Sequence, residues 1–214
     1  MLFAAKSYNM ADMNKAAVNP FRAARFIMSC AHLEQLPEPE VPEIAIAGRS
    51  NAGKSSALNA LCDQKTLARV SKTPGRTQLL NFFEVPDLGR IVDLPGYGYA
   101  AVPGKTRKDW GELVTGYIES RQNLRGLVLV MDIRHPLMDY DLQLLGWAFK
   151  QNRLLHCLLT KSDKLAYGAA RSTLLKVREK LGGRASADLF SAYEKTGIAE
   201  TVERLQPWFG APDA

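Results

Sequence analysis

Gly48-Arg-Ser-Asn-Ala-Gly53-Lys54-Ser55 is the stretch that decides the fold of this sequence. It fits G-x-x-x-x-G-K-[ST] at every position, directly after an apolar run (Ile44 to Ala47) and directly before a segment of helical spacing (Lys54 to Cys62). In such a strand-loop-helix unit, backbone N–H groups surround phosphates, the lysine meets the β and γ phosphates, and the last hydroxyl ligates Mg²⁺. The helix N-terminus adds its own attraction for anions. We therefore expect a nucleoside triphosphate site, with Lys54 on phosphate and Ser55 on Mg²⁺.

The chain beyond this stretch alternates short apolar runs with helical patterns. The apolar runs are Leu80 to Val85, Arg90 to Leu94, Leu127 to Ile133, Leu154 to Leu159 and a short last one at Asp188 to Ser191, and the helical segments are Tyr140 to Lys150, Arg171 to Leu181 and Ile198 to Phe209. Buried strands alternating with helices predict an α/β fold, a mainly parallel sheet with helices on both faces. Ligands of such sheets bind at the carboxyl ends of the strands, where the motifs of this sequence fall.

Composition excludes several classes of protein. Of the 214 residues, 46% are apolar and 23% are charged, as in soluble globular proteins. The longest apolar runs have about five residues, far below the ~20 that a membrane span needs. Cys30, Cys62 and Cys157 lie too far apart for a zinc site or a disulfide framework, so we expect buried thiols in a reducing compartment. The net charge is +6, and the basic excess between Lys65 and Lys108 suits a polyanionic partner, although a solvated face explains it equally well.

Two further motifs distinguish GTP from ATP. Asp93-Leu-Pro-Gly96 is a D-x-x-G sequence, whose carboxylate can hold Mg²⁺ through water while the Gly96 amide senses the γ phosphate. Thr160-Lys-Ser-Asp163 resembles N-K-x-D, and the Asp163 carboxylate can accept both N–H donors on the Watson–Crick edge of guanine, a pairing that adenine does not offer. Phe190-Ser-Ala192 follows the last predicted strand and suits a backbone contact to the guanine carbonyl. The sequence therefore favours GTP over the alternative of a P-loop ATPase or small-molecule kinase.

A hydroxyl-bearing loop, Ser71 to Gln78, lies between the P-loop (Gly48 to Ser55) and D-x-x-G. A flexible loop of this kind can order around Mg²⁺ and the γ phosphate while GTP is bound. Thr77 is the predicted second protein ligand of Mg²⁺, with Thr73 as the alternative. An ordinary polar loop is the competing interpretation.

Together these motifs, with Asn81-Phe-Phe83, Asp93 to Tyr99 and Asp132-Ile-Arg-His135, resemble the EngB (YihA/YsxC) family of ribosome-biogenesis GTPases. A threonine at position 160 is usual in that family. The resemblance implies a Ras-like domain that binds GTP and Mg²⁺, hydrolyses GTP slowly, and acts in the bacterial cytoplasm in assembly of the large ribosomal subunit, and hence in growth and cell division. It runs from about Phe26 to about Phe209, which suggests an N-terminal extension (1–25), a G domain (26–210) and a C-terminal tail (211–214).

The predicted site follows from these motifs. The residues assigned to catalysis are Lys54, Thr77 and Gly96, and the metal ligands are Ser55 and Thr77. The predicted nucleotide contacts are Gly48, Arg49, Ser50, Asn51, Ala52, Gly53, Lys54, Ser55, Gly75, Arg76, Thr77, Gln78, Leu79, Asp93, Leu94, Pro95, Gly96, Thr160, Lys161, Ser162, Asp163, Phe190, Ser191 and Ala192.

Tyr97 stands where Ras-type enzymes place the glutamine that orients the attacking water. Tyrosine has no amide for this task, so a partner group or a monovalent cation has to complete the site. Asn51 resembles the asparagine by which several relatives bind K⁺, against the alternative of a loop cap. Arg76 is either an internal arginine finger or a solvated cation, and Asp132 with Arg134 either braces the nucleotide side or forms a structural pair.

Together, the motifs and the family resemblance imply a monomeric GTP-driven assembly switch whose partners are GTP or GDP and, as the resemblance implies, the large-subunit precursor. The segment Tyr97 to Lys108 mixes aromatic and basic groups, as RNA-contacting loops do, although a plain solvated switch has the same composition. The alternative from another class is a non-enzymatic RNA- or ribosome-binding module that nucleotide merely stabilises.

Overall fold

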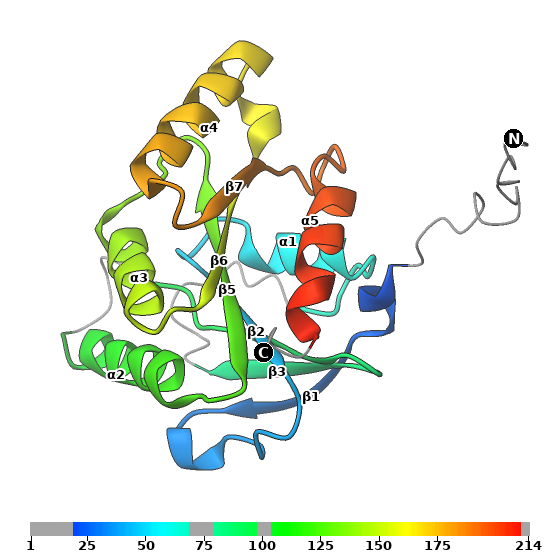
Figure 1. Cartoon of the computed structure of the whole chain (residues 1–214), viewed down its shortest axis with the longest axis vertical. Helices are drawn as coiled ribbons and strands as arrows, with labels where there is room; N and C mark the ends of the chain where they lie inside the picture. Colours follow the sequence, from blue (N-terminus) through cyan, green and yellow to red (C-terminus); the bar gives the residue numbers. More distant parts are fainter. Residues whose placement is uncertain (1–18, 69–78, 98–103, 211–214) are drawn as a thin grey trace, which may run out of the picture.

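A seven-stranded sheet in the order β1-β3-β4-β2-β5-β6-β7 forms the centre of the molecule (Figure 1). The computed structural model describes residues 19–68, 79–97 and 104–210, with the backbone alone for residues 104–110. The strands are β1 (Arg25–Cys30), β2 (Glu43–Gly48), β3 (Leu80–Val85), β4 (Gly89–Asp93), β5 (Leu124–Asp132), β6 (Leu154–Thr160) and β7 (Ser186–Leu189). Strands β4, β2, β5, β6 and β7 pair in parallel, and β3 runs antiparallel between β4 and β1. The predicted mainly parallel α/β sheet is confirmed.

Helices cover both faces of the sheet, as the alternating pattern predicts (Figure 1). The helices are α1 (Lys54–Leu61), α2 (Gly104–Ser120), α3 (Asp139–Lys150), α4 (Tyr167–Leu181) and α5 (Ile198–Leu205), with short 3₁₀ turns at Pro20–Ala23, Leu33–Gln35, Ser162–Lys164 and Gln206–Phe209. Helices α1 and α5 pack on one face, and α2, α3 and α4 pack on the other. None of the helices in the described part of the chain is long and apolar enough to cross a bilayer.

Strand β2 shows why the sheet is buried on both faces. All six of its residues are buried, and neighbouring side chains point to opposite faces because the side-chain period of a strand is two. Ile44 and Ile46 enter the core under α1 and α5, whereas Ala45 and Ala47 enter the core under α2 and α3. A central strand of this kind needs an unbroken apolar sequence, which is the pattern that identified it.

The N-terminal boundary of the folded region precedes the predicted residue 26. The Asn19 side chain donates a hydrogen bond to the carbonyl of Leu61 over 2.7 Å, and the fully buried Phe21 ring lies 5.8 Å from the ring of Phe209. β1 then pairs with β3 along the edge of the sheet. Residues 19–25 are therefore part of the packed domain in this structure, although the sequence analysis assigned them to the extension. Residues 1–18 and 211–214 lie outside the described residues.

Helix α2 corrects the prediction of a loop from Tyr97 to Lys108, because the helix begins at Gly104. The helix is stabilised by its later turns, where Leu113, Val114, Tyr117 and Ile118 are buried at helical spacing. Another difference lies at the C-terminal end: the predicted closing helix becomes α5 followed by a 3₁₀ turn, since Pro207 lacks the N–H that an α-helix needs.

Candidate functional site

The P-loop joins β2 to α1 at the carboxyl edge of the parallel strands. A Cβ atom on Gly48 would lie 2.6 Å from the carbonyl oxygen of Val130 in the neighbouring strand, so only glycine fits there. Gly53 has φ of 98°, in the left-handed region that favours glycine, and it places Lys54 at the first position of α1. The predicted strand-loop-helix unit is thus present, with its glycines at the positions where the backbone requires them.

Lys54 forms an ion pair with Asp93, the first residue of the D-x-x-G motif. Both side chains are largely buried, with 11% and 9% of their surfaces exposed. The pair is possible because β4, which ends at Asp93, lies beside β2 in parallel register. The fold therefore brings together the two motifs that were predicted to bind phosphate and Mg²⁺, although 39 residues separate Lys54 from Asp93 in the sequence.

The two predicted base-recognition segments also meet. The hydroxyl of Ser191 donates to Oδ1 of Asp163 over 2.7 Å, and Nζ of Lys164 lies 3.0 Å from Oδ2. The hydrogen bond from Ser191, followed by that from Lys164, lowers the pKa of Asp163. The Asp163 carboxylate is thereby kept ionised, so both of its oxygens remain hydrogen-bond acceptors.

Thr160 and Lys161 tie the base-recognition segment to the P-loop. The buried hydroxyl of Thr160 donates to the carbonyl of Ala52, and Nζ of Lys161 donates to the carbonyl of Asn51 over 2.7 Å. Lys161 is held in turn by Asp132, whose Oδ2 lies 2.9 Å from Nζ. The threonine that replaces asparagine thus makes a direct contact with the P-loop.

Asp132 connects Lys161 with Arg134. Arg134 donates to both carboxylate oxygens of Asp132, from Nε over 2.9 Å and from Nη2 over 2.7 Å. Partial burial raises the pKa of Asp132, but the hydrogen bonds from Arg134 and Lys161 outweigh it and hold that pKa far below its usual range. The structure therefore contains the structural ion pair, and its carboxylate also holds the lysine that contacts the P-loop; a role on the nucleotide side stays a prediction.

A cavity of about 250 Å³ lies beside the P-loop. Its lining residues are Arg49, Ser50, Asn51, Ala52, Met131, Asp132, Arg134, His135, Asp141 and Lys161. The cavity therefore joins the P-loop to the segment that follows β5 and to the first turn of α3.

The side chains of two residues predicted to contact nucleotide lie in the core. Leu94 is buried, and its N–H donates to the carbonyl of Ile46 over 2.9 Å. Phe190 is also buried, its N–H donates to Leu159, and its carbonyl accepts from Ser162. These backbone groups are paired within the protein, so both residues help to position their segments, and their contact with nucleotide stays a prediction. Gly75, Arg76, Thr77 and Gln78, and the alternative ligand Thr73, lie outside the described residues.

Asp141 is the residue at this site that the sequence analysis missed. It lies in the first turn of α3, and its Oδ2 accepts the N–H of Met138 over 2.8 Å. The hydroxyl of Tyr97 donates to its other oxygen, Oδ1. An acidic residue three positions after a helix start signals capping, which accounts for the bond from Met138 but not for the one from Tyr97.

The comparisons with known proteins agree with this geometry. Residues 43–161 match the family model described as 50S ribosome-binding GTPase. The chain is 50% identical over 192 residues to the probable GTP-binding protein EngB of Salmonella paratyphi B and to that of Escherichia coli K12, covering 88% of this chain and 91% of each relative.

Solved structures match the fold. The crystal structure of a probable GTP-binding protein EngB superposes with a TM-score of 0.65 at 20% identity, covering 78% of this chain and 98% of that chain. Aquifex aeolicus Era bound to GDP and AlF₄⁻ superposes with a TM-score of 0.62 at 18% identity, covering 80% of this chain and 57% of that one. The domain has the Ras-like P-loop GTPase fold, and the chain belongs to the EngB family of GTP-binding proteins and is a GTPase.

Proposed function

We propose that this GTPase is a switch in assembly of the large ribosomal subunit in the bacterial cytoplasm, acting as a monomer and required for growth and cell division. In this proposal GTP orders residues 71–78 and the segment between Tyr97 and the start of α2, the ordered surface binds immature ribosomal RNA or protein, and hydrolysis releases it. The observation that carries the proposal is the match of residues 43–161 to a model of 50S ribosome-binding GTPases. The basic excess between Lys65 and Lys108 supports a polyanionic partner.

Mg²⁺ fits the oxygen donors at the phosphate end of the site. The Ser55 hydroxyl follows Lys54 in the first turn of α1, and the Asp93 carboxylate pairs with that lysine. Hydroxyl and carboxylate oxygens are the ligands that this hard cation prefers. On nucleotide binding, Lys54 would exchange Asp93 for phosphate oxygens, and the freed Asp93 carboxylate would help to hold Mg²⁺ together with Ser55 and the second proposed protein ligand, Thr77. Bound there, Mg²⁺ would neutralise phosphate charge.

Guanine is read at the other end of the site. Ser191 and Lys164 hold Asp163 by one oxygen each, and each carboxylate oxygen retains a further lone pair for the N1–H and amino group of the base. Gly96, Lys54 and Thr77 are the residues we assign to sensing and stabilising the γ phosphate.

Intrinsic hydrolysis is slow in this proposal because of where Tyr97 lies. Its ring is buried in the core and its hydroxyl donates to Asp141, so it does not orient an attacking water. We assign the missing stabilisation to K⁺ held at Asn51. The backbone carbonyl of Asn51 accepts a hydrogen bond from Lys161, which fixes this part of the P-loop. Hydrolysis that is equally fast in potassium and in sodium at matched ionic strength would contradict this assignment.

Cosedimentation with large-subunit particles tests the proposal. The protein should sediment with the particles when a non-hydrolysable GTP analogue is present and should remain in the supernatant with GDP. Equal binding in both states would exclude a GTP switch. Turnover that stays negligible with particles present would instead favour the non-enzymatic binding module.

A further inference from the structure

Tyr97 is joined to the P-loop through its backbone and to α3 through its side chain. Its carbonyl accepts the N–H of Ser50 over 2.8 Å, and it forms an isolated parallel bridge with Arg49. Its hydroxyl donates to Oδ1 of Asp141, and both residues are nearly fully buried, with 3% and 2% of their surfaces exposed. Tyr97 is therefore fixed at both ends, directly after the glycine of D-x-x-G.

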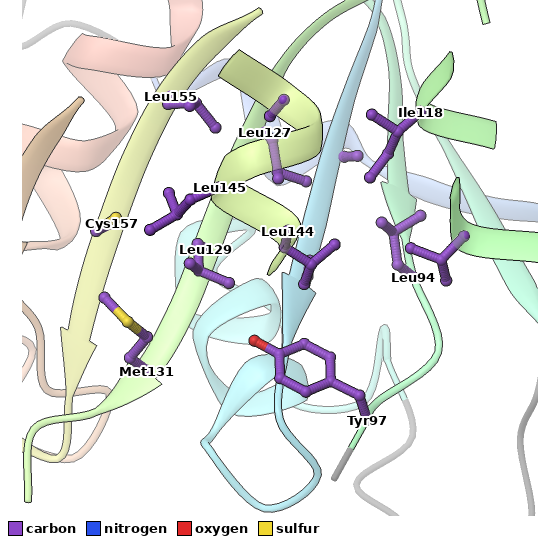
Figure 2. Packing of buried hydrophobic residues seen from close by; sticks show 14 of the residues in the cluster. Leu94, Tyr97, Ile118, Leu127, Leu129, Met131, Leu144, Leu145, Leu155 and Cys157 are labelled. Atoms are coloured by element: carbon purple, nitrogen blue, oxygen red, sulfur yellow. The ribbon is translucent and has the colours of Figure 1, made fainter. Parts of the chain in front are cut away.

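The core makes this arrangement rigid. Figure 2 shows the Tyr97 ring turned inward from the end of the D-x-x-G segment into the cluster that contains Leu129, Met131 and Leu144. Leu144 belongs to α3, the helix that also carries Asp141. The hydroxyl of Tyr97 therefore reaches its acceptor across a packed interface, where both side chains are largely shielded from solvent.

Asp141 is itself held in place. Its second oxygen, Oδ2, accepts the N–H of Met138, which fixes the carboxylate at the start of α3. The preceding residue, Leu137, has φ of 57°, an uncommon conformation for leucine that the packing of this turn maintains. Asp141 thus offers Tyr97 an acceptor whose position the fold determines.

Gly96 lies between these fixed points. A Cβ atom on Gly96 would approach Cα of Ser50 to 3.3 Å and its nitrogen to 3.4 Å, so the glycine packs closely on the P-loop. Before it, the N–H of Leu94 is bonded to Ile46, and after it, Tyr97 is bonded to Ser50 and Asp141. The direction of the Gly96 amide is set by these neighbours.

We propose that Asp141 is a positioning residue of this GTPase: by holding the Tyr97 hydroxyl, it fixes the Gly96 amide where it distinguishes GTP from GDP. The inference rests on the contact of Gly96 with the γ phosphate assigned under the proposed function. A tyrosine at position 97, where Ras-type enzymes have glutamine, then has a structural role of its own. Its long side chain reaches α3 and anchors the loop that senses the γ phosphate.

Electrostatics keep the phenol in its donor form. Burial, followed by the charge of Asp141 and the hydrogen bond to it, raises the pKa of Tyr97 well above its usual value. Burial also raises the pKa of Asp141, against the hydrogen bonds from Tyr97 and Met138 and the charge of Arg49. The phenol therefore stays protonated at neutral pH and donates to Asp141.

The test compares Tyr97→Phe with Tyr117→Phe. Tyr117 is a matched control, because it is also a buried tyrosine whose hydroxyl donates to a buried carboxylate, that of Glu43, over 2.8 Å at the amino end of β2. Both variants should lose stability to denaturant. In Tyr97→Phe alone, affinity for a non-hydrolysable GTP analogue should fall about tenfold while GDP affinity stays within about twofold, since one buried hydrogen bond is lost.

Asp141 variants separate positioning from packing. Asp141→Ala should lose the preference for the GTP analogue as Tyr97→Phe does, and the double variant should be no worse than either single variant, because both remove the same bond. Asp141→Asn keeps an oxygen acceptor and should retain part of the preference. In all of them the turnover number should fall more than KM rises, with the turnover measured on protein that is folded by circular dichroism.

The outcomes distinguish this inference from the assignments on which it rests. If Tyr97→Phe keeps the wild-type ratio of GTP-analogue to GDP affinity, or if Tyr117→Phe loses that ratio equally, the positioning role of Asp141 is overturned. Gly96→Ala tests the sensing glycine separately: an unchanged ratio in that variant shows that the assignment of Gly96 is wrong. Because these titrations use only purified protein and nucleotides, they do not depend on the ribosomal proposal.

Discussion

The hydroxyl of Thr160 donates a hydrogen bond to the backbone carbonyl of Ala52, joining the end of β6 to the middle of the P-loop. It also lies 3.0 Å from the carbonyl of Met131. One hydroxyl thus connects the base-recognition segment with both the P-loop and β5. A shorter side chain than asparagine suffices here because the loop passes close by: a Cβ atom on Gly53 would lie only 3.5 Å from the Thr160 hydroxyl.

Thr160→Val removes this hydroxyl and preserves the side-chain shape. We expect affinity for GDP and for the GTP analogue to fall by a similar factor, about tenfold, because the P-loop loses a buried hydrogen bond in both states. A titration with a fluorescent nucleotide measures the effect. Thr201→Val is the matched control, since Thr201 of α5 is similarly buried and donates to the carbonyl of Gly197, the residue before that helix. Equal loss of nucleotide affinity in the control would show that general destabilisation, not the P-loop contact, is responsible.

Local patterns sufficed to predict β2, the P-loop and α1. Their strand period, their glycines and the helix start lie within 20 residues of one another, so no distant partner is needed to recognise them. The edge strand β1 was missed because most of its residues are exposed, which removes the apolar run that marks a buried strand. The burial of Phe21 was not predicted for a related reason: its ring packs on Phe209, which lies near the other end of the chain.

In the candidate site, too, residues within local motifs were predicted, and a residue with a distant partner was not. Motif spacing identified Lys54, Asp93 and Asp163, because the residue types themselves carry the chemistry. Asp141 escaped because its acidic side chain is accounted for locally as a helix cap, and its second partner, Tyr97, lies 44 residues away. A motif also does not predict where each side chain points: Leu94 and Phe190 lie within motifs, but their side chains face the core.

His156 makes stability depend on pH. It is fully buried on β6, with Nδ1 2.8 Å from the hydroxyl of Ser186 and Nε2 3.7 Å from Asp188. Burial lowers the pKa of His156 to about 4. The charge of Asp188 raises this pKa, and the charges of Arg204 and Arg178 lower it further. In the unfolded chain the pKa of this histidine is near 6.5, so between pH 6.5 and pH 4 the unfolded chain binds the proton more readily than the folded chain. The free energy of unfolding therefore has its full value above about pH 6.5 and falls as the pH drops toward 4.

Urea denaturation at pH 7, 5.5 and 4.5 measures this effect. The free energy of unfolding should fall by ~2 kcal/mol over this range in the wild type. The decrease should be smaller in His156→Gln, which cannot take up the proton. An identical pH profile in the two proteins would show that His156 is not responsible.

Lys105 and Lys108 test the ribosomal surface. Both lie in the first turns of α2, next to the segment that GTP is proposed to order. Because phosphate contacts release counterions, binding of particles should weaken steeply with salt, and charge reversal at both positions should weaken it further. GTP affinity should change little. Lys176→Glu with Lys180→Glu, on exposed positions of α4, is the control for net charge. Unchanged particle binding by the Lys105 and Lys108 variant would remove this surface from the proposal.

Asp163→Asn changes the hydrogen-bonding pattern offered to the base. One carboxylate acceptor becomes an N–H donor and faces a donor of guanine; such a buried mismatch costs ~1 to 3 kcal/mol, and more when a charged acceptor is lost. GTP affinity should therefore fall at least about tenfold. The P-loop, Asp93 and the contact of Thr160 with Ala52 are untouched, so the variant should remain folded.

Xanthine provides the positive half of this test, since it carries a carbonyl where guanine has its amino group. The amide donor of Asp163→Asn then meets an acceptor, so the variant should prefer xanthosine triphosphate, as competitive titration of the two nucleotides would measure. Ser191→Ala is the matched control: it removes the hydroxyl that donates to Asp163 over 2.7 Å but leaves the carboxylate in place, so GTP should bind more weakly and still be preferred. If folded Asp163→Asn keeps its preference for GTP, Asp163 does not read the base. If the preference switches to xanthosine triphosphate in Asp163→Asn but not in Ser191→Ala, the carboxylate itself recognises the base.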